Sequence, residues 1–278
     1  MSSSSDLLSR FTVAPTWDEW RALTPQEQQV VYDALPTEEP GAAPPEGTRH
    51  FEAKVTALDT LRRFYRRSGR RAFVASELPV HYPGERVFVP DLLVVFDVED
   101  HDRTKWLVTR EGKGLDFVLE VHDGGERRKD LERRRDQLAR LRVPEYFVYD
   151  RSRGALHGFE LPTPDASTYR PIVPQLGKYA SDVLGLELQV VEQRLRFTYF
   201  DAQLPESTEL IQRMEQALSD LEEKREEEQR RREEEQRLRE EEQRRREEEQ
   251  RLREEVEREN EALRAQLAAL RARKDRGE

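Results

Sequence analysis

Two acidic residues, Asp91 and Glu120, each interrupt an otherwise apolar run of the sequence. Asp91 lies in VFVPDLLVV, and Glu120 lies in LDFVLEVH. Both runs have the composition of buried strands, where a carboxylate requires a cation or a hydrogen-bond partner. If the two strands are neighbours, their carboxylates can converge on one hard cation such as Mg²⁺, which prefers oxygen ligands. The pair therefore predicts a shared metal site.

A metal held in this way could lower the pKa of a bound water and stabilise charge on a phosphate during in-line attack. Glu52, on a predicted helix, is a candidate third acid. The structural alternative is that Asp91 hydrogen-bonds locally after Pro90, that Glu120 pairs with an arginine, and that Glu52 is merely exposed. The residue pattern by itself leaves both interpretations open.

The elements that must position these acids can be predicted from the surrounding sequence. Residues 115–150 contain a strand (LDFVLEVH), a Gly-containing turn, a strongly basic helix (RRKDLERRRDQLARLR) and a second strand (PEYFVYD). Upstream, apolar residues at helical spacing from His50 to Tyr65 predict a first core helix, which Gly69 ends. With further short β runs on both sides, including Val87 to Phe96, this order predicts an α/β or α+β fold with a mixed sheet flanked by helices.

Composition divides the 278-residue chain into three parts. We expect an N-terminal helical accessory segment and linker at 1–44, a core domain at 45–204 and a charged helical tail at 205–278. The sequence has no run of about 20 apolar residues and no apolar signal segment, so we expect a cytoplasmic protein with no membrane partner. Because the chain has no Cys, disulfides, thiolate zinc sites and Cys nucleophiles are excluded.

The tail repeats REEEQRR or REEEQRL from Arg225 to Leu252. Many Glu residues precede an Arg by four positions, and each such pair stabilises a helix by about 0.2–0.5 kcal/mol. One heptad frame runs through the tail, apolar at both ends and charged in the middle. Asn260 occupies an a position, an arrangement that selects register in two-stranded coils. The tail is predicted to be either a coiled coil that makes the protein a homodimer or a solitary charged helix.

The order of several runs resembles a known family: HYPGERVFVPDLLVVFDVED, REGKGLDFVLEVH, GGERRKDLE and ARLRVPEYFVYDRSRGALHGFEL, followed by SDVLGLELQV. Over about residues 45 to 200, the sequence is similar to the Uma-two family of restriction endonucleases, a branch of the PD-(D/E)XK nuclease superfamily. The resemblance implies a mixed sheet flanked by helices and metal-dependent hydrolysis of phosphodiester bonds. It implies that Asp91, Glu120 and the Val121 carbonyl bind Mg²⁺ or Mn²⁺, and that Glu52 matches an acid of the first core helix.

The sequence departs from this family pattern at the motif's lysine. His122 stands two positions after Glu120, and Arg134 and Leu138 occupy the places on the following helix where family members often carry Lys and Tyr. Arg does not deprotonate in proteins and is a poor general base. Lys129 is the best surviving lysine, and a neutral His122 could accept a proton near pH 7. The site is therefore either catalytic through one of these residues or degenerate.

Two basic clusters flank the acids in sequence, one from Arg62 to Arg71 and one from Arg127 to Arg142. They would suit phosphate positioning on a nucleic acid, although charged helix faces are commonly only solvated. The His residues other than His122 show no metal-ligand spacing and are expected at the surface.

Three functional hypotheses follow from these patterns. The first is a Mg²⁺-dependent DNA endonuclease that dimerises through residues 205–278. The second is a catalytically degenerate nuclease-fold binding or scaffold protein that oligomerises through the same tail. The third is an accessory protein in DNA or RNA processing whose catalytic subunit is separate.

Overall fold

The computed structural model describes residues 11, 13–40, 47–123 and 128–274, and the side chains of 128–130 and 269–274 are also outside the described part. Contacts divide the chain into two units, Met1–Leu210 and Ile211–Glu278. The first unit contains the sheets and their helices, and the second is a single helix. The three predicted domain boundaries stay predictions, but the contacts group the N-terminal segment with the core.

A six-stranded mixed sheet forms the centre of the first unit, with strand order β1-β3-β5-β6-β7-β8. Its strands are β1 (Ala72–Ala75), β3 (Leu92–Phe96), β5 (Phe117–His122), β6 (Glu145–Asp150), β7 (Ala155–Glu160) and β8 (Arg170–Pro171). β5 and β6 are parallel, and the other neighbours are antiparallel. All five residues of β3 are buried, as expected for a strand covered on both faces. The predicted mixed sheet is confirmed.

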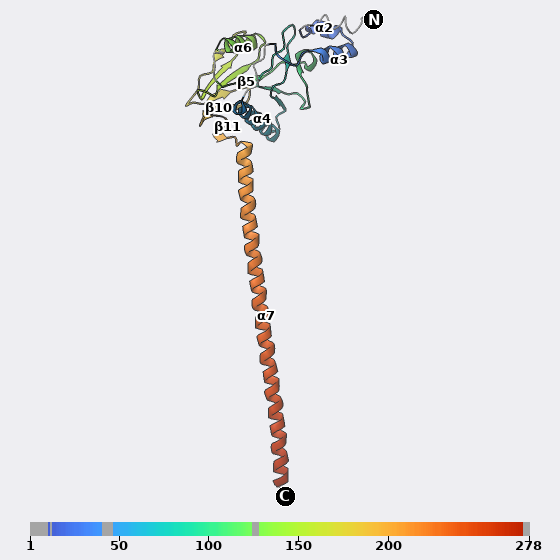
Figure 1. Ribbon diagram of the computed structural model, residues 1–278, viewed down its shortest axis with the longest axis vertical. Helices are drawn as coiled ribbons and strands as arrows, with labels where there is room; N and C mark the ends of the chain where they lie inside the picture. The colour runs from blue at the N-terminus through green and yellow to red at the C-terminus, as the bar shows by residue number, and fades with distance from the viewer. Residues whose placement is uncertain (1–10, 12, 41–46, 124–127, 275–278) are drawn as a thin grey trace. The chain divides into compact units, whose positions relative to one another are not determined.

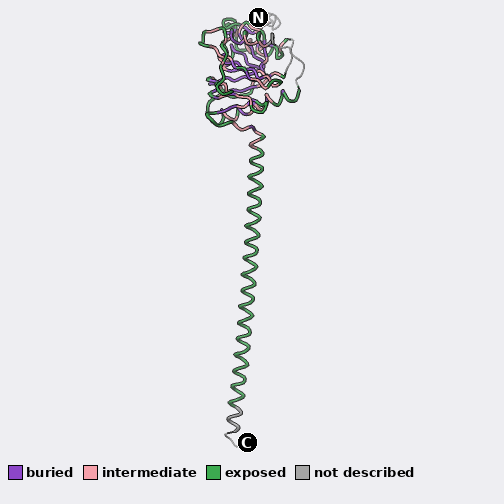
Figure 2. Tube along the Cα trace, turned by 90° about the vertical axis from the view of Figure 1, so that its left-hand side faces the viewer, coloured by how far each residue is buried: buried purple, intermediate pink, exposed green. Residues whose placement is uncertain are grey.

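Two helices cover opposite faces of this sheet. α4 (Thr48–Ser68) packs through Leu61 against Leu92 and Leu119, whereas α6 (Arg128–Arg140) packs through Leu138 against Val118. Neighbouring residues of one strand therefore face different helices, which follows from the two-residue period of a strand. Figure 2 shows the buried residues gathered in these layers. As predicted, α4 ends at Gly69, which adopts a left-handed conformation with a φ of 74°.

The predicted strand from Val87 to Phe96 forms only in its second half. Pro90 has no N–H for a strand ladder, and the chain bends at Asp91 before β3 begins at Leu92. This bend is fixed by Ser76, whose hydroxyl donates a 2.6 Å hydrogen bond to the Asp91 carbonyl. The break in the strand thus positions one of the two predicted acids.

Smaller elements complete the first unit (Figure 1). A four-stranded sheet has the order β12-β11-β10-β9 and shares its core with α4, and a two-stranded parallel sheet pairs β2 with β4. The elements not yet given bounds are β2 (Val80–His81), β4 (Trp106–Leu107), α5 (Val108–Glu111), β9 (Tyr179–Ser181), β10 (Leu186–Val191), β11 (Arg194–Tyr199) and β12 (Ala202–Gln203).

The N-terminal helices are α2 (Trp17–Ala22) and α3 (Pro25–Ala34), and each begins with a capping box. Trp20 and Val31 pack with Leu107 in a small core that is separate from the cores on the two faces of the sheet. Lys105 is buried beside this core and donates a 2.6 Å hydrogen bond to the Leu35 carbonyl. The N-terminal helices are therefore packed against the rest of the first unit through buried side chains.

The second unit consists of α7 (Ser207–Lys274), a continuous helix of 68 residues whose first turn lies in the first unit. At 1.5 Å per residue it is about 100 Å long. The predicted long C-terminal helix is confirmed, and Figure 2 shows it exposed from Ile211 to Ala268. Among the described residues, no helix combines the length and apolar content needed to span a membrane.

Candidate functional site

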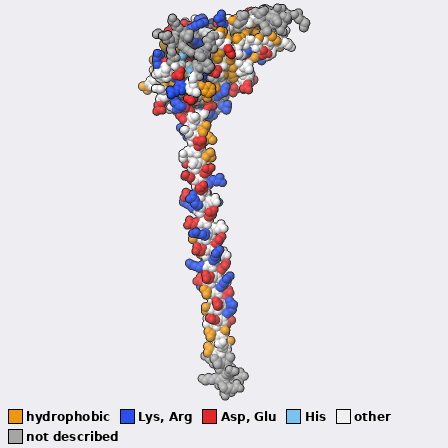
Figure 3. Space-filling view, viewed as in Figure 1, with side chains coloured by type: hydrophobic (Ala, Val, Ile, Leu, Met, Phe, Trp, Pro, Cys, Tyr) orange, Lys and Arg blue, Asp and Glu red, His pale blue; other side chains and the backbone are white. Residues whose placement is uncertain are grey.

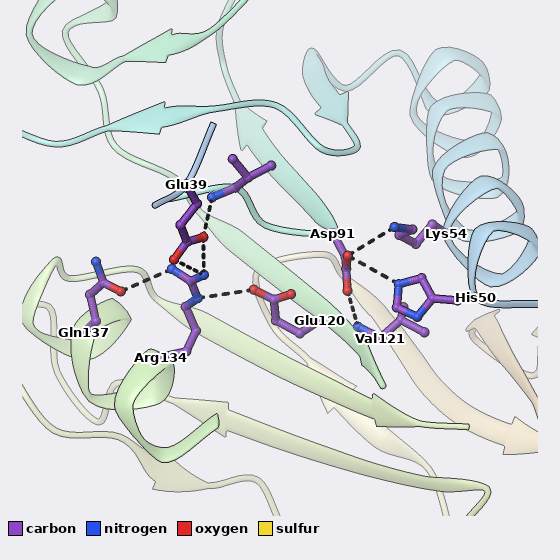
Figure 4. A network of polar contacts seen from close by, with 9 residues as sticks. Glu39, His50, Lys54, Asp91, Glu120, Val121, Arg134 and Gln137 are labelled. Carbon is purple, nitrogen blue, oxygen red and sulfur yellow. Dashed lines mark hydrogen bonds and ion pairs between the residues drawn. The ribbon is translucent and has the colours of Figure 1, made fainter. Parts of the chain in front are cut away.

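The two predicted acids lie side by side at one end of β3 and β5. Leu92 stands opposite Leu119, and one further step along this register sets Asp91 opposite Glu120. Asp91 Oδ2 accepts a 2.7 Å hydrogen bond from the Val121 N–H. Both carboxylates are largely buried, with 15% and 14% of the side chain exposed. Figure 4 shows the pair between α4 and α6.

The backbone of Val121 offers a third oxygen at this place. In a strand the N–H and C=O of one residue point to the same edge, so the Val121 carbonyl is directed, like its N–H, towards β3 and Asp91. Pro90 stands opposite Val121 when the register is continued, and it has no N–H to donate. The carbonyl therefore receives no ladder hydrogen bond from that residue.

α4 brings two further residues to Asp91. His50 and Lys54 lie one turn apart, and both are buried. Lys54 Nζ is 3.4 Å from Asp91 Oδ1 and 2.5 Å from Glu77 Oε1. His50 Nε2 is 3.5 Å from the same Asp91 oxygen. Lys54 and His50 thus contact Asp91 Oδ1, and the Val121 N–H donates to Asp91 Oδ2. The prediction of a surface position for His50 is wrong.

Sequence reasoning missed Lys54, although its spacing carried a signal. Lys54 precedes Ala57 by three positions and Leu61 by seven, which places all three on one helix face. The apolar residues Phe51 and Val55 pointed to a different face, yet both are exposed. A lysine on the buried face of an amphipathic helix requires an anion, and the two lone acids were the available anions.

α6 brings Arg134 to the other acid. Arg134 Nε is 3.6 Å from Glu120 Oε1, and its terminal nitrogen donates hydrogen bonds of 3.0 and 2.7 Å to the two carboxylate oxygens of Glu39. Glu39 itself accepts a hydrogen bond from the Val89 N–H. Arg134 also donates to Gln137 (Figure 4). The N-terminal segment therefore completes the surroundings of Glu120.

The surroundings move the pKa values of the two acids in opposite directions. Burial and the neighbouring charge of Asp91 raise the pKa of Glu120 well above its usual range, and Arg134 only partly opposes them. Burial also acts to raise the pKa of Asp91, but the hydrogen bonds from His50 and Val121 and the charge of Lys54 outweigh it and lower that pKa. The site therefore holds one negative charge readily and resists a second.

Two buried polar atoms beside the pair have no hydrogen-bond partner among the described residues. They are Glu120 Oε1, which has only its ion pair with Arg134, and the hydroxyl of Tyr146 on β6. Tyr146 and Glu120 lie on the same face of the sheet, and the charge of Glu120, second to burial, raises the pKa of that hydroxyl. Unpaired buried oxygens are costly, and a ligand would satisfy them.

The other predicted site residues are placed differently. His122 ends β5, and strand alternation sets it on the face of Glu120, while its carbonyl accepts a 2.7 Å hydrogen bond from the Arg151 N–H. Glu52 is exposed on α4, so the structure does not bring it to the acids. The backbone of Lys129 belongs to α6, but its side chain lies outside the described residues.

Several residues of the first basic cluster make contacts within the protein. Arg62 Nε donates a 2.9 Å hydrogen bond to the Val74 carbonyl, and Arg70 lies 3.4 Å from the centroid of the Phe96 ring. Arg63 binds Asp59. These contacts give the arginines structural roles that do not require a nucleic acid.

The described residues contain no group of three or more His, Asp or Glu side chains arranged to hold a metal. Asp91 and Glu120 are two neighbouring carboxylates, and the Val121 carbonyl lies beside them. Mg²⁺ is commonly bound by one or two carboxylates and keeps several waters. The small ligand set fits such an ion.

Comparison with known proteins places the site in a family. The family model named Uma2, with the description "Putative restriction endonuclease", matches residues 17–193, which is more than half of the chain. The chain belongs to the Uma2 family. The matched region includes Asp91, Glu120 and the N-terminal helices, and so begins earlier than the resemblance noted in the sequence.

No curated protein matches this Uma2 chain. Among solved structures, it is similar to a protein described as a putative nuclease belonging to DUF820 from Anabaena variabilis. The two share 12% sequence identity with a TM-score of 0.41, and the similarity covers 61% of this chain and 90% of the other.

Proposed function

We propose that this Uma2 protein is a metal-dependent endonuclease that hydrolyses phosphodiester bonds in DNA. The observation that carries the proposal is the Asp91–Glu120 pair, two adjacent buried carboxylates at the end of neighbouring strands. The family description, a putative restriction endonuclease, supports the same reaction class. Together they favour a nuclease over a protein that only binds or scaffolds.

Asp91, Glu120 and the Val121 carbonyl would hold Mg²⁺ or Mn²⁺. The Oε1 of Glu120, which has no hydrogen-bond partner, and the raised pKa of that carboxyl fit a place where a divalent cation compensates the second negative charge. When bound, such an ion would polarise the scissile phosphate and lower the pKa of a water. Asp91 and Glu120 would fix the position of the ion, and the bend at Pro90 would fix the position of Asp91.

Lys54 would supply the positive charge that the motif's lysine supplies in relatives. Its ammonium group lies 3.4 Å from Asp91 and is buried, so it is shielded from water and held in place by two carboxylates. A fixed cation next to the metal ligands can stabilise charge that develops on a phosphate. Arg134 would do the same beside Glu120, without acting as a base. His122 and Lys129 stay candidate bases.

The proposal includes a homodimer formed through the tail at 205–278. Two copies of the chain supply two sites, and each site hydrolyses one strand at a time. The reaction at each site does not depend on the tail, so a monomer would still nick one strand.

Cleavage of supercoiled plasmid tests the proposal. Purified protein is incubated with Mg²⁺ or Mn²⁺, and the wild type is compared with Asp91→Asn and Glu120→Gln. We expect metal-dependent nicking or linearisation that both variants lose. Equal cleavage by wild type and both variants would refute the assigned site. No cleavage with either metal would instead identify a degenerate nuclease fold.

A further inference from the structure

α7 carries one unbroken heptad frame whose ends differ from its middle. Its a positions are Ile211, Leu218, Arg225, Arg232, Arg239, Arg246, Arg253, Asn260 and Leu267, and its d positions within the described side chains are Met214, Leu221, Glu228, Glu235, Glu242, Glu249, Val256 and Leu263. The apolar members of this seam are each more than half exposed. Figure 3 shows hydrophobic side chains near both ends of the helix and mixed charges between them.

A parallel pairing of two such helices is electrostatically unfavourable. In a parallel two-stranded coil an a residue meets the a residue of the other chain, and a d residue meets d. From Arg225 to Arg253 this would set Arg opposite Arg and Glu opposite Glu in every successive layer. Like charges packed at a seam repel, and the e positions of this segment, all Gln from Gln229 to Gln250, offer no compensating charge.

Reversing one helix removes this conflict because a then meets d. We propose that α7 binds α7 of a second copy of this chain in antiparallel orientation. The register sets Arg239 opposite Glu242, and the layers on either side then pair oppositely charged residues. These further pairs are Arg232 with Glu249, Glu235 with Arg246, and Glu228 with Arg253.

The same register covers the apolar ends. The start of α7 in one copy packs against its end in the other, with Met214 opposite Leu267 and Leu218 opposite Leu263. Two mixed layers, Leu221 with Asn260 and Arg225 with Val256, separate these apolar layers from the charged middle. A shift of one heptad keeps the Arg–Glu pairs, but this register also aligns Ile211 with the sequence position of Leu270, whose side chain lies outside the described residues. Burial of these exposed apolar side chains is the driving force that a solitary helix lacks.

The single helix already contains charge pairs of its own. Arg239 lies 2.6 Å from Glu235, and Arg246 lies 2.7 Å from Glu242, each pair joining a d residue to the following a residue. Such exposed pairs each contribute about 0.3–0.5 kcal/mol. They stabilise the charged middle in either state but leave the apolar ends in water.

The antiparallel arrangement has a geometric consequence. The N-terminal ends of the two copies of α7 lie at opposite ends of the coil, about 90 Å apart for a 60-residue overlap. In a parallel coil the same two ends would be adjacent. This difference does not depend on the proposed nuclease activity, so it can be tested in a protein that cleaves nothing.

Disulfide cross-linking of the full chain distinguishes the two orientations, because the natural sequence has no Cys. Met214→Cys and Leu267→Cys are made as separate variants that carry tags of different size. The two variants are unfolded together, refolded and oxidised. We expect a mixed dimer that joins position 214 to position 267, and little cross-linking of either variant alone. Homodimers of each variant would indicate a parallel coil and overturn the proposal. The matched control is Gln216→Cys at an f position, which should not cross-link.

Sedimentation equilibrium with charge-reversed variants provides the second test. Arg232→Glu places Glu opposite Glu249 and should weaken the dimer at least tenfold. Adding Glu249→Arg restores an opposite pair and should restore the dimer. A wild type that is monomeric at tens of micromolar would overturn the proposal, as would a double variant no stronger than the single one.

Discussion

Asp91, which directly precedes β3, and Glu120, on the neighbouring β5, are two acids of similar exposure, yet their surroundings differ. Asp91 faces α4, where Lys54, His50 and the Val121 N–H stabilise its charged form. Glu120 faces α6, where one longer ion pair with Arg134 only partly offsets burial and the charge of Asp91.

The helix that packs beside each acid therefore determines whether the protein itself stabilises the charged form of that carboxyl. α4 holds a permanent anion at Asp91, and α6 leaves Glu120 dependent on a further cation. A symmetrical pair, with both acids fully neutralised by the protein, would have little reason to bind a metal.

The largest effect is expected from removing the cation of α4. Lys54→Met should lower plasmid cleavage by about 100-fold, the loss typical of one electrostatic group in an active site. Arg49→Met, an exposed change in the same helix, is the matched control and should cleave like wild type. Arg134→Lys, which installs the lysine expected from the family pattern, should not rescue Lys54→Met. Rescue would show that α6 supplies the essential cation.

Stability in the absence of metal should separate the two acids. Asp91→Asn removes a charge that Lys54 and His50 stabilise, and we expect it to lower the free energy of unfolding by about 2 kcal/mol. Glu120→Gln removes a charge that the site resists, so it should be neutral or stabilising. Urea unfolding with EDTA present measures both. Equal destabilisation by the two variants would contradict the contrast.

The pH dependence of the Glu120→Gln effect follows from the direction of the pKa shift. The folded pKa of Glu120 is raised, so folding favours its protonated form, and wild-type stability falls as pH rises from the ordinary value of 4.5 through the folded pKa. The free energy of unfolding of Glu120→Gln, relative to that of the wild type, should therefore be higher at pH 8 than at pH 4. Urea midpoints at the two pH values, with EDTA, measure it; a larger advantage at pH 4 would reverse the sign.

The smallest effect is expected from the N-terminal segment. Glu39→Gln weakens the pair of hydrogen bonds with Arg134, a half-buried contact, and should cost about 1 kcal/mol. The adjacent Glu38→Gln is exposed and should change the free energy of unfolding by less than about 0.5 kcal/mol. Matching losses in the two variants would mean that Glu39 does not support the site.

Sequence patterns predicted the mixed sheet, the first core helix, the convergence of Asp91 with Glu120 and the long C-terminal helix. They were sufficient there because a lone acid in an apolar run and a strict heptad are local signals. They failed at Glu39 because its contact with Arg134 joins segments distant in sequence and Glu39 lies in a stretch without apolar periodicity. They failed at Lys54 because the buried face of its helix was misassigned. On α4 the misleading apolar residues Phe51 and Val55 also suggested the wrong buried face.

Glu52 was predicted to be the third acid of the site, but its side chain is exposed. It lies between His50 and Lys54 in sequence, but a displacement of two residues turns a side chain by about 200° around a helix of 3.6 residues per turn. Its exposure follows from that rotation. The residue that reaches the acids from this helix is a cation.

Manganese binding to the apo protein, followed by electron paramagnetic resonance of free Mn²⁺, tests directly whether Asp91 and Glu120 form a metal site. We expect one site per chain in the wild type and loss of that site in both Asp91→Asn and Glu120→Gln, with Glu38→Gln unchanged. Undiminished binding in the two site variants, or no binding by the folded wild type at millimolar Mn²⁺, would contradict it.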